Sequence, residues 1–255
     1  LPVSAAEWLN EHAPAGRLWT DYTSSSGFYY FTRPHRPVPI LTNTWAYPPA
    51  VMTEVLEYCF GRRPFGQAVA RYGVEIVAMR VEQTYGPLAR HLADGPDWAL
   101  VHLDGWHAIF VRRAGPNADL ARRLEITERS LDVPGHIRRL RALDPVPAYG
   151  LHLGGVTLYQ LGWDWPAVEV FRAAAEEDPS YPRTWNMLGL CLARRGLRRI
   201  EGGDYGGKAD WEEARGCFLR AIERDRDYDE ARVNLALLQR QLAALDKGVI
   251  LQPRQ

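Results

Sequence analysis

The stretch LHLGGVTLYQLGWDWPAVEVFRAAAEEDP, residues 151–179, decides the fold of the second half of this chain. It carries small and large apolar residues at helical spacings and ends in a proline. The pattern begins again 34 residues later, because Trp185 follows Leu151 and Gly189 follows Gly155 at that distance. A period of this length predicts a stack of helix pairs, each of which buries its apolar face only against its neighbours.

The second helix of the next pair is displaced along the chain. Its small–aromatic–small set is Ala214, Phe218 and Ala221, which lie 47 residues after the matching positions of the first pair, 13 more than the period. We therefore expect a loop insertion at about 197–210 and, after it, a capping helix over 229–246.

These spacings resemble the tetratricopeptide (TPR) repeat. The matching positions of the first repeat are Leu151, Gly155, Gly162, Ala167, Phe171, Ala174 and Pro179. The resemblance implies repeats at 148–181 and 182–228 and a concave face, built from the first helix of each pair, that holds a protein or peptide partner. The residues that we expect on this face are Tyr149, His152, Tyr159, Arg183 and Asn186.

The insertion contains EGGDYGGKAD, residues 201–210, in which Gly202, Gly207 and Lys208 have the spacing of a phosphate-binding loop. Such a loop follows a strand and has Ser or Thr after the lysine to hold magnesium. Here Ala209 follows the lysine, and the preceding residues have a helical pattern. We interpret the segment as an elongated turn between two helices and expect no cofactor.

Residues 1–113 alternate short helical and strand-like segments, which is typical of an α/β domain. We expect a small Rossmann-like α/β domain with five or six strands, followed by a linker with short helices at 114–147, the TPR domain at 148–246 and a tail at 247–255. The expected strands are RLWTDY (17–22), GFYYFT (27–32), VPILTN (38–43), VEIVAMR (74–80) and a hairpin over 98–113 that turns at Asp104 and Gly105. Because VEIVAMR is almost continuously apolar, we expect it to be covered on both faces.

Polar residues follow the first expected strand of this domain. Ligands of open α/β sheets gather outside the carboxyl ends of strands, so we predict a ligand site at Asp21, Tyr22, Ser24, Ser25 and Ser26. The alternative is a polar loop that opens with an Asx turn. His102, Asp104 and His107 surround the hairpin, but a tight turn explains Asp104 without a metal, and we predict none.

Composition and motifs exclude several classes of function. The chain has 31 basic and 31 acidic residues, so no net charge favours nucleic acid. No apolar run approaches the roughly 18 to 20 residues of a membrane span. Cys59, Cys191 and Cys217 have no metal-site spacing, and no GxSxG, GxGxxG or paired-carboxylate motif predicts catalytic residues.

Three segments of the first domain, 5–31, 71–80 and 92–113, together resemble the soluble tail of sugar-transferring membrane proteins of the GT-C or protein mannosyltransferase-like type. The matching residues are Trp8, Leu9, Pro14, Gly16, Asp21, Gly27, Tyr72, Gly73, Val74, Trp98, Asp104, Phe110, Val111 and Arg112. Thr42, Asn43 and Thr44 stand where that family has Asp-Gly-Arg. The resemblance implies a tail outside the cytoplasmic membrane, whose catalytic acids lie in a preceding membrane part; the start at Leu1 agrees with a piece of a longer chain.

Our leading hypothesis is therefore a noncatalytic interaction or scaffold module of a membrane-anchored, glycosyltransferase-like protein, at the periplasmic face of a bacterial inner membrane. Its expected partner is a protein or peptide, with a glycan as an alternative. A rival hypothesis is that the α/β domain binds or processes a sugar-containing small molecule around Asp21. A cytosolic TPR adaptor is the third.

Overall fold

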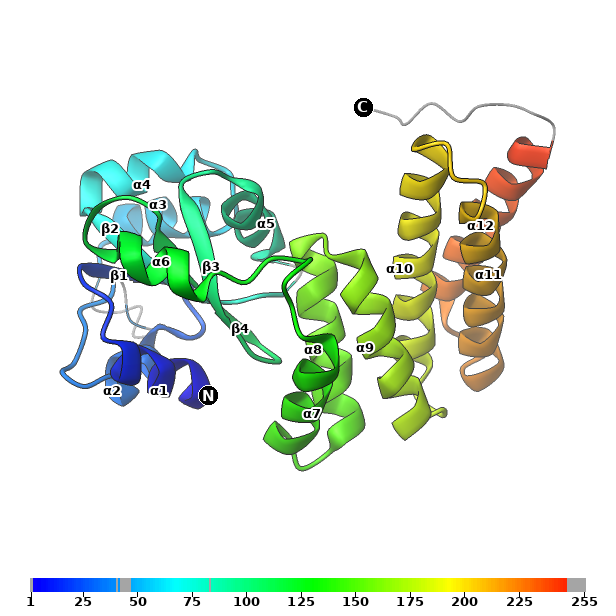
Figure 1. Cartoon of the computed structure of the whole chain (residues 1–255), viewed down its shortest axis with the longest axis horizontal. Helices are drawn as coiled ribbons and strands as arrows, with labels where there is room; N and C mark the ends of the chain where they lie inside the picture. Colours follow the sequence, from blue (N-terminus) through cyan, green and yellow to red (C-terminus); the bar gives the residue numbers. More distant parts are fainter. Residues whose placement is uncertain (1, 40, 42–46, 83, 247–255) are drawn as a thin grey trace. The chain divides into compact units, whose positions relative to one another are not determined.

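The computed structural model describes residues 2–39, 41, 47–82 and 84–246, and the chain divides into two compact units (Figure 1). We call residues 1–132 with 160–162 the α/β unit, and residues 133–159 with 163–255 the helical unit. Within the described ranges, no helix combines the length and apolarity that a bilayer span requires.

The α/β unit contains four strands among its described residues. Its elements in chain order are α1 (Val3–His12), β1 (Arg17–Thr20), α2 (Ser25–Phe31), α3 (Pro49–Cys59), α4 (Phe65–Tyr72), β2 (Val74–Arg80), α5 (Gly86–Asp94), β3 (Trp98–Leu103), β4 (His107–Arg112), the short 3₁₀ helix η2 (Gly115–Asn117) and α6 (Ala118–Leu124).

The sheet is mixed, with the strand order β1-β2-β4-β3. β1 runs parallel to β2, whereas β4 is antiparallel to both β2 and β3. The predicted hairpin over 98–113 is confirmed, because β3 and β4 pair on either side of the Asp104–Gly105 turn. The Rossmann-like prediction is not confirmed, since one of the three pairings between described strands is parallel and a Rossmann sheet is mostly parallel.

Helices cover both faces of this sheet (Figure 1). On one face, Ile76 and Ile109 form a buried cluster with residues of α1, α2 and α6. On the other face, Trp19 packs edge-on against Tyr58 of α3 and Phe65 of α4. Coverage on both faces explains the apolar run of β2, as predicted. Part of the expected linker is also ordered, because α6 packs against β3 and β4.

The prediction of a strand at 27–32 is wrong, because this segment lies mostly in α2. Aromatic residues favour strands, but that preference depends on the packing they find. As a helix, α2 buries Phe28 completely beneath the sheet, and Thr32 donates its hydroxyl to the Phe28 carbonyl at the helix end. The strand predicted at 38–43 is also not observed at residues 38, 39 and 41, while residues 40, 42 and 43 lie outside the described residues.

The helical unit is a TPR-like array of antiparallel helices. It consists of α7 (Val133–Leu143), α8 (Pro147–Leu161), α9 (Asp164–Glu177), α10 (Pro182–Glu201), α11 (Gly207–Arg224) and α12 (Asp229–Asp246). One contact recurs in both pairs. A Cβ atom added to Gly155 of α8 would lie 2.7 Å from the Phe171 ring of α9, and one added to Gly189 of α10 would lie 2.6 Å from the Phe218 ring of α11. The repeated glycine therefore lets the phenylalanine of the second helix lie against the backbone of the first.

The expected loop at 197–210 is wrong, because most of the insertion is helical. α10 continues to Glu201 and α11 begins at Gly207, so these helices have 20 and 18 residues where α8 and α9 have 15 and 14. The extra residues lengthen both helices of the second pair and leave a short turn at 202–206.

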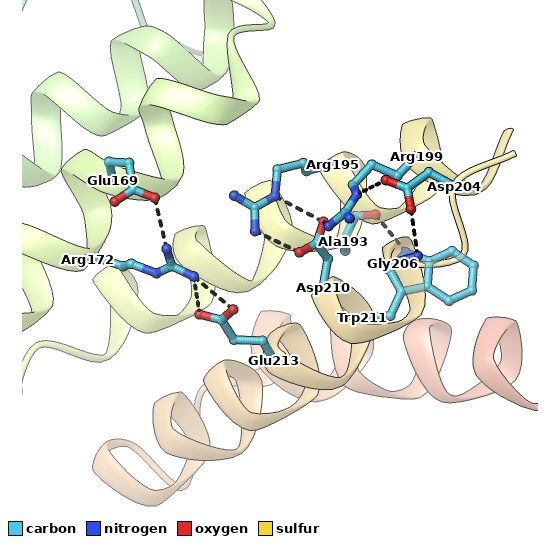
Figure 2. A network of polar contacts seen from close by, with 10 residues as sticks. All are labelled: Glu169, Arg172, Ala193, Arg195, Arg199, Asp204, Gly206, Asp210, Trp211 and Glu213. Carbon is cyan, nitrogen blue, oxygen red and sulfur yellow. Dashed lines mark hydrogen bonds and ion pairs between the residues drawn. The ribbon is translucent and has the colours of Figure 1, made fainter. Parts of the chain in front are cut away.

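Polar and close contacts between α10 and α11 explain this extension (Figure 2). Arg195 donates two hydrogen bonds to Asp210, of 3.0 and 2.7 Å, and both side chains are buried. The Trp211 indole donates to the Ala193 carbonyl at 2.8 Å. At the turn, Asp204 accepts hydrogen bonds from Arg199 and from the Gly206 amide. This paired, buried charge holds the long hairpin together, because separating the two helices would leave the buried Arg195 guanidinium without its carboxylate partner.

Candidate functional site

The Asp21 carboxylate lies at the end of β1 and is 1% exposed. Its Oδ1 atom accepts hydrogen bonds from the Thr23 hydroxyl at 2.5 Å and the Ser24 amide at 2.9 Å, and its Oδ2 atom accepts one from the Arg80 amide at 2.7 Å. This is the Asx-turn geometry that the sequence left open. The carboxylate ties the turn after β1 to the end of β2.

The serines after Asp21 have different surroundings. Ser25 is fully buried and donates its hydroxyl to the Tyr22 carbonyl at 2.9 Å. Tyr22 and Ser26 are partly exposed and also have interaction partners. The ligand-binding role of this segment stays a prediction, for which Tyr22 and Ser26 offer the accessible atoms.

Ser24 contacts a residue that sequence reasoning did not connect with it. Its hydroxyl lies 3.3 Å from Nε2 of His107, and Nδ1 of His107 lies 3.6 Å from Oδ1 of Asp104. His102 approaches the other carboxylate oxygen of Asp104, also at 3.6 Å. Ser24 and His107 are 83 residues apart, and only the packing of the β1–α2 turn against the hairpin brings them together.

Burial alone would raise the pKa of Asp104, but the imidazoles of His102 and His107 outweigh it and hold the pKa well below the ordinary value. Oδ1 of Asp104 also accepts the amide hydrogens of Trp106 and His107, both at 2.7 Å, within the hairpin turn. The carboxylate is therefore an anion fixed in place. No group of three or more metal-ligating side chains with suitable geometry occurs in the described part of the chain.

Serine, histidine and aspartate in this order are the groups of nucleophilic serine catalysis. A nucleophile must also be accessible to its substrate, but Ser24 is only 5% exposed. Asp104, in addition, already accepts a backbone hydrogen bond within the hairpin turn. The arrangement as it stands links two loops of the α/β unit through a buried polar cluster.

The residues predicted on the first-helix face divide into exposed and buried members. Tyr149 and Arg183 are exposed. His152 is buried, lies 3.1 Å from the Thr184 hydroxyl and has its ring edge-on to those of Phe171 and Tyr181. Burial, with a smaller contribution from Arg183, lowers the pKa of His152 to about 4, so this imidazole is neutral at pH 7.

Asn186 and Tyr159 are also engaged within the helical unit. Asn186 donates to the Tyr228 hydroxyl at 3.2 Å and accepts from Asn234 of α12 at 3.0 Å. The Tyr159 ring lies 3.9 Å below the guanidinium of Arg194. Hydrogen bonds thus join α8 to α10 and α10 to α12, and these three helices share one face.

Sequence reasoning missed the exposed apolar residues of that face. Counting 34 and then 47 residues along the repeat takes Val156 to Leu190 and Leu237, and takes Asn186 to Val233. Val233 and Leu237 are 57% and 52% exposed on α12, one helical turn apart. We define the first-helix face as Tyr149, Val156, Arg183, Leu190, Val233 and Leu237. The signal was the repeat period itself, applied to the last helix.

The phosphate-loop residues have structural roles. α10, a helix, precedes Gly202, and the ammonium group of Lys208 pairs with Asp246 of α12 at 2.5 Å. A Cβ atom at Gly207 would lie 2.3 Å from the Gly196 carbonyl oxygen, so this glycine is needed where α10 and α11 touch.

No protein-family model matches the chain, and no curated protein matches it. Among solved structures, the crystal structure of the Sgt2 TPR domain from Aspergillus fumigatus is similar over 55% of this chain and 82% of that chain, with 19% sequence identity and a TM-score of 0.35. The TPR-like description of the helical unit rests on its own recurring glycine–phenylalanine contacts.

Proposed function

We propose that the chain is a noncatalytic protein-interaction module that holds a protein or peptide partner on the first-helix face. The observation that carries the proposal is the exposure of Val233 and Leu237 beside a rigid hydrogen-bonded row of polar side chains. Exposed apolar side chains gathered on one face mark interaction sites, whereas isolated ones are ordinary. A rigid row beneath them reduces the ordering cost of binding.

A matched pair of substitutions tests this function. Gln239 is exposed on α12 but lies two residues beyond Leu237, so it points to the opposite side of the helix. We expect Leu237→Arg to release a partner that is recovered with the unaltered chain, while Gln239→Arg retains it. Recovery is quantified by mass spectrometry after pulldown from the source cells. Equal recovery with both variants contradicts the proposal.

The wider setting is a further part of the proposal. The motif resemblance of residues 1–113 supports a chain that continues a membrane-anchored, glycosyltransferase-like protein and lies at the extracytoplasmic face, where a glycan is an alternative partner. The full open reading frame tests this directly. Several apolar spans upstream of Leu1 are expected, and a short soluble leader in their place favours a cytosolic adaptor.

The alternative function of the α/β unit is binding of a sugar-containing small molecule near Asp21. The partial exposure of Tyr22 and Ser26 just after β1 is the observation that favours it, because their hydroxyl groups can exchange hydrogen bonds with sugar hydroxyls. A ligand of the folded state raises its melting temperature. A thermal-shift screen with sugar nucleotides and oligosaccharides, repeated with Ser26→Ala, therefore measures this function independently of the helical unit.

A further inference from the structure

A groove with a volume of about 400 Å³ opens between α9 and α11, with α10 behind it. Its lining includes Arg172 of α9, Trp185 of α10, and Gly216, Cys217 and Arg220 of α11. Volumes of this order are common for sites that bind small molecules or single side chains. None of these residues belongs to the first-helix face, so the groove is a separate surface of the helical unit.

Gly216 lines the groove and leaves space in it because it has no side chain. It is the tenth residue of the 18-residue helix α11, where a glycine is less favourable than an alanine. Gly155 and Gly189 have a packing reason, because a phenylalanine ring lies against each of them. A Cβ atom at Gly216 would meet no atom within 4 Å. Packing therefore does not require this glycine, while its missing side chain leaves space in the groove.

The two arginines that line the groove differ in whether they pair with a carboxylate. Arg172 is neutralised, because it donates to Glu169 at 2.8 Å and to both carboxylate oxygens of Glu213 at 2.7 and 2.9 Å (Figure 2). Arg220 lies 4.7 Å above the Trp185 ring, and none of the described carboxylates is within ion-pair distance of it. The groove thus offers one arginine that is free to pair with an anion.

The apolar part of the groove is held in place. The Trp185 indole donates to the Pro179 carbonyl at 2.9 Å, which fixes the orientation of the ring. Burial raises the pKa of the Cys217 thiol to about 12, so this part of the lining is uncharged at neutral pH. A planar apolar surface therefore lies next to an unpaired guanidinium, and these two features complement an apolar group that carries a carboxylate.

We propose that the groove between α9 and α11 binds an apolar or aromatic group next to a free carboxylate, with the carboxylate on Arg220 and the apolar group against Trp185 in the space beside Gly216. Two sources supply this chemistry: the carboxyl-terminal residue of a partner chain and a free α-amino acid. Glu176 also lines the groove and distinguishes them, because it attracts the ammonium group that only the free amino acid carries.

The test follows the indole N–H signal of Trp185 by NMR in the full chain, assigned through its loss in Trp185→Phe. The probes are N-acetyl-L-phenylalanine, its primary amide and L-phenylalanine. We expect the acid to shift the signal saturably at millimolar concentration and the amide to bind at least about tenfold more weakly, because a hydrogen bond to a charged group is lost. Tighter binding of N-acetyl-L-phenylalanine indicates a chain terminus, and tighter binding of L-phenylalanine indicates a free amino acid.

Three variants locate the site. Arg220→Gln should weaken binding of the acid by a similar factor and leave that of the amide unchanged, whereas Arg224→Gln, one turn further along α11, should have no effect. Gly216→Leu should abolish binding of all probes without loss of folding, because the added side chain enters open space. The proposal is overturned if no probe gives a saturable shift, if acid and amide bind equally, or if Gly216→Leu still binds.

Discussion

Replacing Gly189 with alanine should destabilise the helical unit, although alanine is the better helix former. An added Cβ atom would lie 2.6, 2.8 and 2.9 Å from three atoms of the Phe218 ring, closer than carbon atoms pack. Crowding of this kind in a packed core costs about 1–3 kcal/mol. The gain in helix propensity offsets about 1 kcal/mol of that cost. The expected net loss is therefore about 0–2 kcal/mol.

Gly216→Ala is the matched control, because it makes the same substitution where no atom lies within 4 Å. It should stabilise the protein by about 0.5–1 kcal/mol, so the two variants should differ by about 1–3 kcal/mol, the cost of crowding alone. Gly155→Ala should behave like Gly189→Ala, since it meets Phe171 in the same way. Urea unfolding followed by far-ultraviolet circular dichroism measures these differences. If Gly189→Ala and Gly216→Ala change the stability equally, the close glycine–phenylalanine contact is not what holds the helix pairs together.

Three further predictions concern buried polar groups, each measured by urea unfolding. Asp210→Ala should cost about 3–5 kcal/mol, because it leaves buried Arg195 without its main partner. Asp119→Ala, which removes an exposed ion pair, should change the stability far less. Similar losses in both variants contradict this reasoning. The pKa of His152 is lowered to about 4 in the folded state, so the unfolded chain binds more protons between about pH 6.5 and pH 4. As the pH is lowered from about 6.5 to 4, the free energy of unfolding should therefore fall by up to about 3 kcal/mol in the unaltered chain, and by less in His152→Gln. The pKa of Asp104 is also lowered in the folded state. For a carboxylate, this stabilisation is complete above the unfolded pKa of about 4 and is lost as the pH falls below it. Asp104→Asn should therefore reduce the loss of stability only below about pH 4.

The helix pairs could be predicted because the residues that pack them lie at regular, short spacings along the chain. Gly155 and Phe171 meet within one repeat, and the period of 34 residues repeats that contact in the next. The hairpin was equally local, since Asp104 and Gly105 specify the turn. Strand directions across the sheet were not predictable in this way, because no residue near β2 or β4 indicates which distant strand will lie beside it.

Two errors have the same physical origin. α2 reads as a strand from its aromatic residues, and only the burial of Phe28 beneath the sheet favours the helix. The insertion reads as a loop from its glycines, but Asp210, at the end of the expected loop, lies in α11 and pairs with Arg195 of α10. In each case a tertiary contact overrode the local preference.

The candidate sites could be predicted from the sequence only in part. The repeat period led to the first-helix face, yet His152 and Asn186 lie buried in its hydrogen bonds, while the more exposed Val233 and Leu237 follow only when the period is carried into α12. The contact between Ser24 and His107 spans 83 residues and had no local signal. The groove beside Gly216 had none either, since a helical glycine is visible in the sequence but the empty space around it is not.

Site-specific photo-crosslinking tests the central claim, that the first-helix face holds a protein partner. A benzoylphenylalanine residue is placed at Leu237 or at Gln239, which are both exposed and lie on opposite sides of α12. The protein is irradiated in its source cells, and crosslinked products are identified by mass spectrometry. We predict one discrete product from position 237, shared with position 233 and absent from position 239. The same product from position 239, or none from positions 233 and 237, would contradict the account.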